Sequence, residues 1–214
     1  MLEQILKGGS MMVPLMACSL VALAVVYDRW VAFRANRKID TKSMRAKVLA
    51  CLQAGNPDGA IAECVATGGP VASVLLVGLR SYVQLRAKGA SAETMRGVVG
   101  QVMQDYSVQA MNVVNRRLDS LSTIAMAAPL FGMTGTVTGM IASFGGMAEA
   151  GSVGGGGGVV AAGIAEALIT TAAGLLIALA AVIPQSVYNR WSDQIGLEIE
   201  EATGEILEFI LAHH

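Results

Sequence analysis

Three long apolar stretches divide the chain, and polar, amphipathic sequence separates the first from the second. They extend from Met11 to Tyr27, from Leu121 to about Phe144, and from Val159 to Ile183. A helix rises about 1.5 Å per residue and must cover about 30 Å of hydrocarbon, so each stretch is long enough for a single crossing, the first only just. The pattern therefore predicts an all-α integral membrane protein with three transmembrane helices.

The sequence between the first two stretches predicts helices that end at identifiable signals. Asn56-Pro57 supplies a cap and a first-turn proline, Gly68-Gly69-Pro70 ends a helix, and Lys88-Gly89-Ala90-Ser91 ends another and caps the next. After Ser91, apolar residues recur at every third or fourth position toward Leu121 without a breaker. We therefore expect one long helix to pass from the aqueous phase into the second span.

Two further patterns concern the second half of the chain. The glycine-rich stretch from Gly145 to Gly158 is expected to form a loop, because glycine costs helix stability. After Asn189 an apolar seam at steps of four and three predicts that the third span continues as a helix packed on its neighbours. The residues of this seam are Ile195, Ile199, Ala202, Ile206 and Phe209.

The placement of basic residues predicts the orientation in the membrane. Of fifteen Lys and Arg residues, thirteen lie between Arg29 and Arg117, and Arg190 follows the third span. By the positive-inside rule the large polar region and the carboxyl terminus are cytoplasmic, whereas the amino terminus and the glycine loop are outside. The expected segments are an interfacial amphipathic helix at 1–10, spans at 11–30, 121–145 and 159–187, cytoplasmic helical regions at 31–120 and 188–214, and an outer loop at 146–158.

Composition agrees with this assignment and excludes one class of partner. Charged residues make up 14% of the chain and apolar residues 54%, whereas soluble proteins are about 25% charged. From Ser120 to Asn189 the only charged residues are Glu149 and Glu166. The net charge of −1 gives no basic field for nucleic acid. We expect membrane lipids, not nucleic acid, as surroundings.

Glu166 is the strongest candidate for function. A carboxylate inside a span costs at least about 2 kcal/mol, so such residues usually face a bundle interior or a water path and mark ion or proton routes. Desolvation favours the uncharged acid, which suits a group that takes up and releases protons. The alternative is a protonated Glu166 that only hydrogen-bonds a neighbouring helix.

Threonine hydroxyls extend the candidate ion pathway. Thr170 lies one turn after Glu166 on nearly the same face, and Thr171 is about 140° around the helix from Glu166. Thr136 and Thr138 would add oxygens from the second span. A single threonine in a membrane helix often bonds its own backbone instead, so each hydroxyl alone is an ambiguous signal.

Small residues in the second and third spans predict close helix packing. Gly135 and Gly139 form a small-xxx-small pair that allows two backbones to approach. Pro129 frees a backbone carbonyl and is expected to bend the second span, as a structural feature or as a hinge. The full set of expected packing residues is Gly132, Gly135, Gly139, Pro129 and Gly174.

Two segments together resemble the signatures of a known family. The segment from Ala128 to Ile141, APLFGMTGTVTGMI, resembles the second-span signature of ExbB, TolQ and MotA-like proton channel subunits. The segment from Gly163 to Leu175, GIAEALITTAAGL, resembles their third-span signature. Three spans rather than four favour the ExbB/TolQ branch.

The resemblance implies a channel or stator subunit of a motor in the bacterial inner membrane, with the outer side facing the periplasm. It implies a homopentamer around two single-span ExbD/TolR-like subunits, with a TonB/TolA-like protein or another envelope effector as a further partner. Glu166, Thr136 and Thr171 would correspond to the family's pore-facing polar residues. The coupling ion would be H⁺ with no bound cofactor or metal, although threonine hydroxyls suit Na⁺ as well.

Two other functions compete with this interpretation. In a membrane scaffold that conducts nothing, Glu166 would only fix assembly. A membrane enzyme would need a nucleophile with its base, or a metal cluster, at membrane depth, and the spans contain no histidine. We therefore expect a protein that is not an enzyme.

Overall fold

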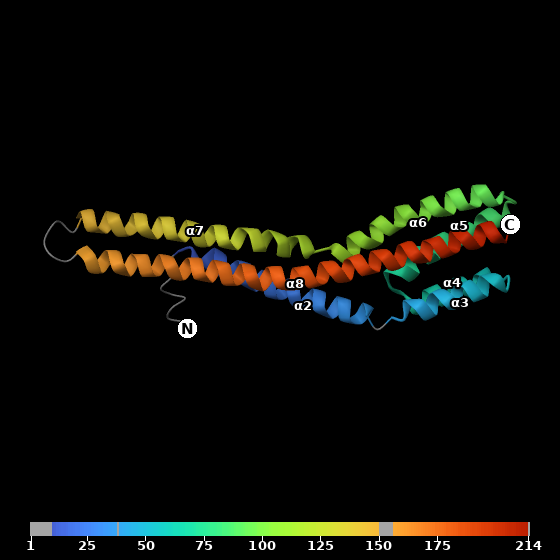
Figure 1. Ribbon diagram of the computed structural model, residues 1–214, viewed down its shortest axis with the longest axis horizontal. Coiled ribbons are helices and arrows are strands. Elements are labelled where there is room, and N and C mark those ends of the chain that lie inside the picture. The colour runs from blue at the N-terminus through green and yellow to red at the C-terminus, as the bar shows by residue number, and fades with distance from the viewer. Residues whose placement is uncertain (1–9, 38, 150–155, 214) are drawn as a thin grey trace. The chain divides into compact units, whose positions relative to one another are not determined.

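The computed structural model describes residues 10–37, 39–149 and 156–213, and these residues form helices joined by short connections (Figure 1). Among them, three helices are long and apolar enough to cross a membrane. The prediction of three spans in an all-helical chain is therefore confirmed. The helices are α2 (Met12–Asn36), α3 (Thr41–Gln53), α4 (Pro57–Thr67), α5 (Gly69–Ala87), α6 (Ala92–Asn115), α7 (Leu118–Glu149) and α8 (Gly156–Ala212). The interfacial helix expected at 1–10 lies almost entirely outside the described residues.

The short helices begin and end at the predicted signals. The Asn56 side chain caps α4 by accepting a hydrogen bond from the Gly59 amide at 2.9 Å. Gly68 follows the last residue of α4 with φ of 67°, a conformation that glycine adopts without steric cost. Ser91 caps α6 by accepting from the Thr94 amide. Local sequence therefore determines these three boundaries.

One predicted element is interrupted. The helix expected to run without a break into the second span stops at Asn115 and restarts at Leu118. Arg117 between them has φ of 74°, a left-handed conformation that costs a residue with a side chain about 1–2 kcal/mol. Its guanidinium forms an ion pair with Asp28 at 2.8 Å, and this long-range contact favours the break that the local sequence does not signal.

The glycine-rich stretch is more helical than expected. Gly145 and Gly146 belong to α7, and Gly156 to Gly158 form the first turn of α8. A Cβ atom at Gly145 would meet nothing within 4 Å, so close packing does not explain its helical state. Gly145 and Gly146 lie within the candidate span Leu118–Ala148, and in hydrocarbon a backbone that leaves the helix loses hydrogen bonds that water cannot replace, which favours the helix at these two residues.

The third span continues as a helix beyond Asn189, as predicted from the apolar seam in that part of the sequence. Helix α8 contains 57 residues and runs through Pro184 without interruption. A proline removes one backbone hydrogen bond, a loss that helices near a membrane tolerate when neighbouring groups satisfy the freed carbonyl.

The chain divides into two compact units. The first contains Met1–Trp30 and Arg117–Val187, and the second contains Val31–Arg116 and Tyr188–His214. In the second unit, α3 with α4 and α5 with α6 form helical hairpins (Figure 1). Ile199, Ile206 and Phe209 of α8 are buried in this unit, and Phe209 packs edge-on against Tyr82.

An ion-pair cluster links α3 to α8 within the second unit. The Arg45 side chain is 13% exposed, bonds Glu201 at 2.7 Å and also pairs with Glu205. The pKa of Arg45 is raised, chiefly because its guanidinium donates hydrogen bonds to Glu205. The polar side of α8 is thus fixed by charge while its apolar seam faces the core.

Candidate ion pathway

Helices α7 and α8 lie side by side in the first unit and run antiparallel (Figure 1). Near one end of their contact Gly174 approaches Ala128, and near the other end Gly163 approaches Ser143. The contacting residues follow each other in opposite order along the two helices, so the helices are antiparallel. The face of α7 that meets α8 consists of small residues at steps of three and four, namely Ala128, Gly132, Gly135, Gly139 and Ser143.

The glycines of this face leave no room for a side chain. A Cβ atom at Gly174 would lie 2.5 Å from the Ala128 carbonyl oxygen, and one at Gly132 would lie 3.0 Å from the Thr171 Cα atom. Small residues allow membrane helices to gain van der Waals contact between backbones. The structure therefore places Gly132, Gly135, Gly139 and Gly174 in a close helix contact, whereas α7 runs through the half-buried Pro129 without interruption.

Thr170 lies inside this contact. Its side chain is 1% exposed, and a Cβ atom at Gly135 would lie 2.5 Å from its Cγ2 atom. Its hydroxyl donates to the Glu166 carbonyl oxygen at 3.1 Å. Among the residues expected in the ion pathway, Thr170 is thus the one that the α7–α8 contact covers most completely.

Thr171 bridges the two helices directly. Its hydroxyl donates a 2.9 Å hydrogen bond to the Gly132 carbonyl oxygen, thirty-nine residues away in sequence. In an α-helix this carbonyl also accepts from the amide four residues on, which belongs to Thr136. The Gly132 carbonyl therefore connects Thr171 to Thr136, another of the threonines expected in the ion pathway.

Glu166 lies beside the contact and not within it. The side chain is half-buried, while the next residue, Ala167, is buried against Gly139. Ala173 is seven residues further along and therefore within about 20° of the same direction around the helix. Ala173 packs against the cluster of Met12, Leu15, Ala128 and Ala178, so Glu166 lies on the side of α8 that also carries α2.

Thr136 and Thr171 lie on the other side of the helix pair. Thr171 is about 140° around α8 from Glu166, and Thr136 is about 140° around α7 from Phe131. Phe131, like Ala173, packs against the cluster that contains Met12 and Leu15 of α2. One copy of the chain therefore brings Thr136 and Thr171 together but holds Glu166 on the opposite edge.

The hydroxyls of α7 bond their own helix. Thr136 donates to the Met133 carbonyl at 2.6 Å, and Thr138 donates to the carbonyls of Thr134 and Gly135 at 3.0 and 3.2 Å. Thr136 is half-buried and Thr138 is exposed. A hydroxyl bonded in this way keeps its oxygen lone pairs available to water or a cation, so the arrangement is compatible with an ion path.

The described residues contain two contacts that sequence reasoning missed. Ser143 is 5% exposed and lies against Gly163, extending the small-residue face by one turn. The position of Ser143 four residues after Gly139, on the same helix face, could have indicated this contact from the sequence. Asp28 pairs with Arg29 and with Arg117, each at 2.8 Å, and connects α2 to the start of α7. Sequence offered no signal for this second contact, because it joins distant segments.

Comparison with known proteins identifies the family of the chain. The profile of the MotA/TolQ/ExbB proton channel family matches residues 68–201, a range that contains α5 to α7, Glu166 and all four threonines. The chain belongs to the MotA/TolQ/ExbB proton channel family. The two antiparallel spans with their small-residue contact are therefore those of a proton channel family member.

Relatives place the chain in the ExbB/TolQ branch. A putative biopolymer transport protein, ExbB-like 3 of Synechocystis sp., is 30% identical over 94% of this chain and 90% of its own length. The ExbB-like 1 protein of the same organism is 33% identical over 98% of this chain and 78% of its own length. The Tol-Pal system protein TolQ of Pseudomonas aeruginosa is 30% identical over 85% of this chain and 76% of its own length. This ExbB/TolQ-type chain is accordingly an inner-membrane protein.

Proposed function

We propose that this ExbB/TolQ-type chain is the channel and stator subunit of a motor that converts the proton-motive force into work on the cell envelope. It acts without a cofactor or catalysed reaction, and H⁺ is the coupling ion. The observation that carries the proposal is Glu166, an acidic side chain held half-buried beside the α7–α8 contact in a segment without a basic residue. Such a carboxyl group is costly in hydrocarbon unless it faces water or a partner.

The distribution of polar groups over the helix pair supports an oligomeric channel. Glu166 lies on one edge of the pair, and Thr136 and Thr171 lie on the other. A path that uses all three residues therefore takes Glu166 from one copy and the two hydroxyls from the next. In this proposal five copies form the ring, and the spans of an ExbD/TolR-like dimer occupy its centre.

Charge distribution supports the orientation of this assembly. With thirteen of fifteen basic residues between Arg29 and Arg117, we place the second unit and the carboxyl terminus in the cytoplasm and the amino terminus in the periplasm. The connection between α7 and α8 is then periplasmic. A TonB/TolA-like effector would receive the work at that side of the membrane.

The decisive experiment replaces Glu166 by glutamine. Glu166→Gln keeps the volume and hydrogen-bonding capacity of the side chain but removes its titratable proton. The complex of the variant chain with its ExbD/TolR-like partner should co-purify normally, and proton flux into proteoliposomes should fall at least about tenfold. Imposing a Na⁺ gradient in place of the proton gradient distinguishes the coupling ion.

Thr123→Val is a control for a substitution in the second span outside the proposed path. Thr123 is exposed and donates only to the Asp119 carbonyl one turn back in its own helix, at 2.9 Å, so this variant should conduct normally. Full proton flux through an assembled Glu166→Gln complex would reject the channel role. The non-conducting scaffold would then become the better description.

A further inference from the structure

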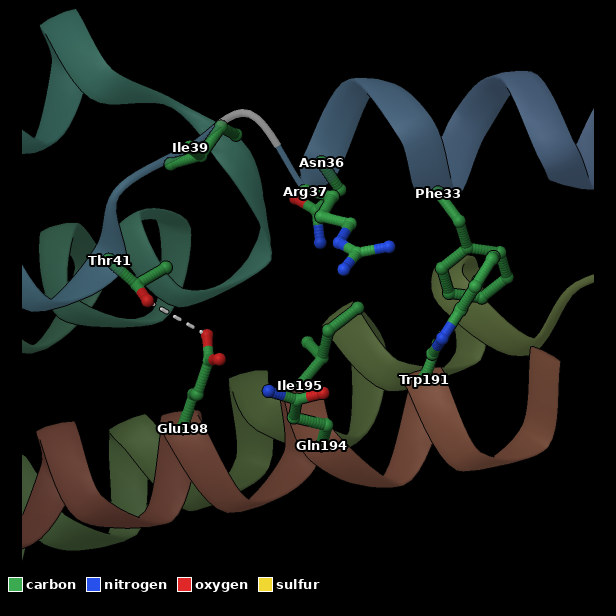
Figure 2. A pocket seen from close by; sticks show the side chains of 9 residues that line it. All are labelled: Phe33, Asn36, Arg37, Ile39, Thr41, Trp191, Gln194, Ile195 and Glu198. Atoms are coloured by element: carbon green, nitrogen blue, oxygen red, sulfur yellow. Dashed lines mark hydrogen bonds between the residues drawn. The ribbon is translucent and has the colours of Figure 1, made fainter. Parts of the chain in front are cut away.

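A polar cavity of about 280 Å³ lies in the second unit, where α2 ends and α8 passes (Figure 2). Its walls come from the last turn of α2, the connection to α3 and one side of α8 between Trp191 and Glu198. Ile195 of α8 forms part of the wall between the two ends of the cavity. The proton channel proposed above does not use this cavity.

The cavity contains one group of each charge. The Arg37 guanidinium extends into the space from the end of α2, and the Glu198 carboxylate lies across it on α8 (Figure 2). Within the part of the chain that the structure describes, these two side chains form no ion pair with each other. Each charge can therefore bind a complementary group of a ligand.

Hydrogen bonding orients the acidic end. The Thr41 hydroxyl donates to Oε2 of Glu198 at 3.0 Å, as the dashed line in Figure 2 shows. This bond fixes the carboxylate and leaves Oε1 available as an acceptor. The Gln194 side chain, which also lines the cavity, adds an amide donor between the two charges.

Aromatic residues place the cavity at the membrane surface. Phe33 lies in the last turns of the candidate span Met12–Asn36 and stacks on Tyr188, with ring centroids 5.6 Å apart. Trp191 packs edge-on against Phe33 at 5.6 Å and also lines the cavity. Clusters of Trp and Tyr at the end of a span are typical of the membrane–water interface, so lipid headgroups are the molecules that the cavity meets.

We propose that this cavity binds the zwitterionic headgroup of phosphatidylethanolamine from the inner leaflet. Arg37 binds the phosphate, for which a guanidinium has matching donor geometry. Glu198 accepts hydrogen bonds from the ammonium group on the other side of the cavity. The two protein charges are complementary to the two headgroup charges.

The acidic residue selects against anionic lipids. Phosphatidylglycerol offers a phosphate to Arg37 but no cation to Glu198, so its binding leaves the carboxylate unpaired near a second negative group. A general basic patch would show the reverse preference. The ratio of the two bound lipids therefore separates this site from nonspecific attraction.

The test measures lipids retained by the full-length oligomer after purification in detergent. Native mass spectrometry counts the bound lipids after exchange with equal amounts of phosphatidylethanolamine and phosphatidylglycerol. The unmodified protein should retain mainly phosphatidylethanolamine. Arg37→Gln should reduce this retention about tenfold, whereas Glu198→Gln, whose amide oxygen still accepts from Thr41, should remove the preference between the two lipids.

Lys42→Gln is the matched control, because Lys42 is an exposed basic residue of α3 outside the cavity. An unchanged lipid preference in Glu198→Gln, or an equal loss in Lys42→Gln and Arg37→Gln, would overturn the proposal. A competition arm adds excess soluble phosphoethanolamine to the protein. Retention of the diacyl lipid supports the lipid as the source of the headgroup, and binding of the free compound without retained lipid contradicts it.

Discussion

The Thr171 hydroxyl of α8 donates a 2.9 Å hydrogen bond to the Gly132 carbonyl of α7. The bond lies at the point where the two backbones are in contact, since a Cβ atom at Gly132 would be 3.0 Å from the Thr171 Cα atom. One residue of the predicted pathway thus also holds the two channel helices together. Its substitution is expected to affect stability as well as ion flow.

Thr171→Val removes this hydroxyl and retains the branched shape of the side chain. Hydrogen bonds between membrane helices contribute about 0.6 kcal/mol on average and up to about 1.7 kcal/mol, so we expect a loss of free energy of unfolding in that range. Thr171→Ser keeps the donor and should lose less. Denaturation in mixed micelles measures both variants, and an equal loss in the two would show that the hydrogen bond is not the cause.

Gly174→Ala should destabilise the helix pair more strongly. The added methyl would lie 2.5 Å from the Ala128 carbonyl oxygen, and a backbone atom cannot rotate away as a side chain can. Overpacking of this kind costs about 1–3 kcal/mol. The same change at Gly145 meets nothing within 4 Å and should be neutral or slightly stabilising. Thermal denaturation of the two purified variants compares them, and equal midpoints would argue against the close contact.

Substitution of Arg117, one of two residues between α6 and α7, separates the effect of backbone strain on stability from the effect of charge. Arg117→Gly and Arg117→Ala both remove the ion pair with Asp28, but only glycine adopts φ of 74° without steric cost. The glycine variant should therefore be more stable than the alanine variant by about 1 kcal/mol. Denaturant titration of the two variants provides the comparison. A more stable alanine variant would mean that α6 and α7 join into one helix.

Cys64 should be unreactive in the folded protein. Burial raises the pKa of its thiol to about 11, with Glu63 adding to the effect, and the thiolate is the reactive form. Iodoacetamide at pH 8 should modify Cys64 only after denaturation, as peptide mass spectrometry would show. The thiol of the unfolded chain has a pKa of about 8.5, whereas the folded chain holds Cys64 neutral up to a higher pH. The free energy of unfolding should therefore fall as the pH rises from about 9 toward 11. Rapid native labelling would contradict the buried position.

Sequence predicted the features that depend on neighbouring residues or on simple periodicity. Asn56, Gly68 and Ser91 act within one turn of their own position, so their caps follow from local geometry. The glycine spacing in the second span likewise indicated a close contact. Hydrophobic length alone was sufficient for the three spans.

Features that depend on distant residues were not predictable in this way. The interruption at Arg117 contains no proline or glycine, and its ion-pair partner Asp28 lies in another helix. The angle between Glu166 and Thr171 follows from helical periodicity, but which edge carries α2 depends on packing at Met12 and Leu15. Gly145 and Gly146 were expected in a loop because glycine counts against a helix in water, whereas the candidate span Leu118–Ala148 includes both residues.

The chain passes between the two units three times, after Trp30, after Arg116 and after Val187. The second and third of these passages differ in helix continuity. The third passage lies within α8, which is one helix of 57 residues, whereas at the second passage Arg116 and Arg117 separate α6 from α7. A continuous helix resists torsion along its hydrogen-bonded length, because each turn is bonded to the next. Of these two passages, the one through α8 is therefore the more resistant to local torsion.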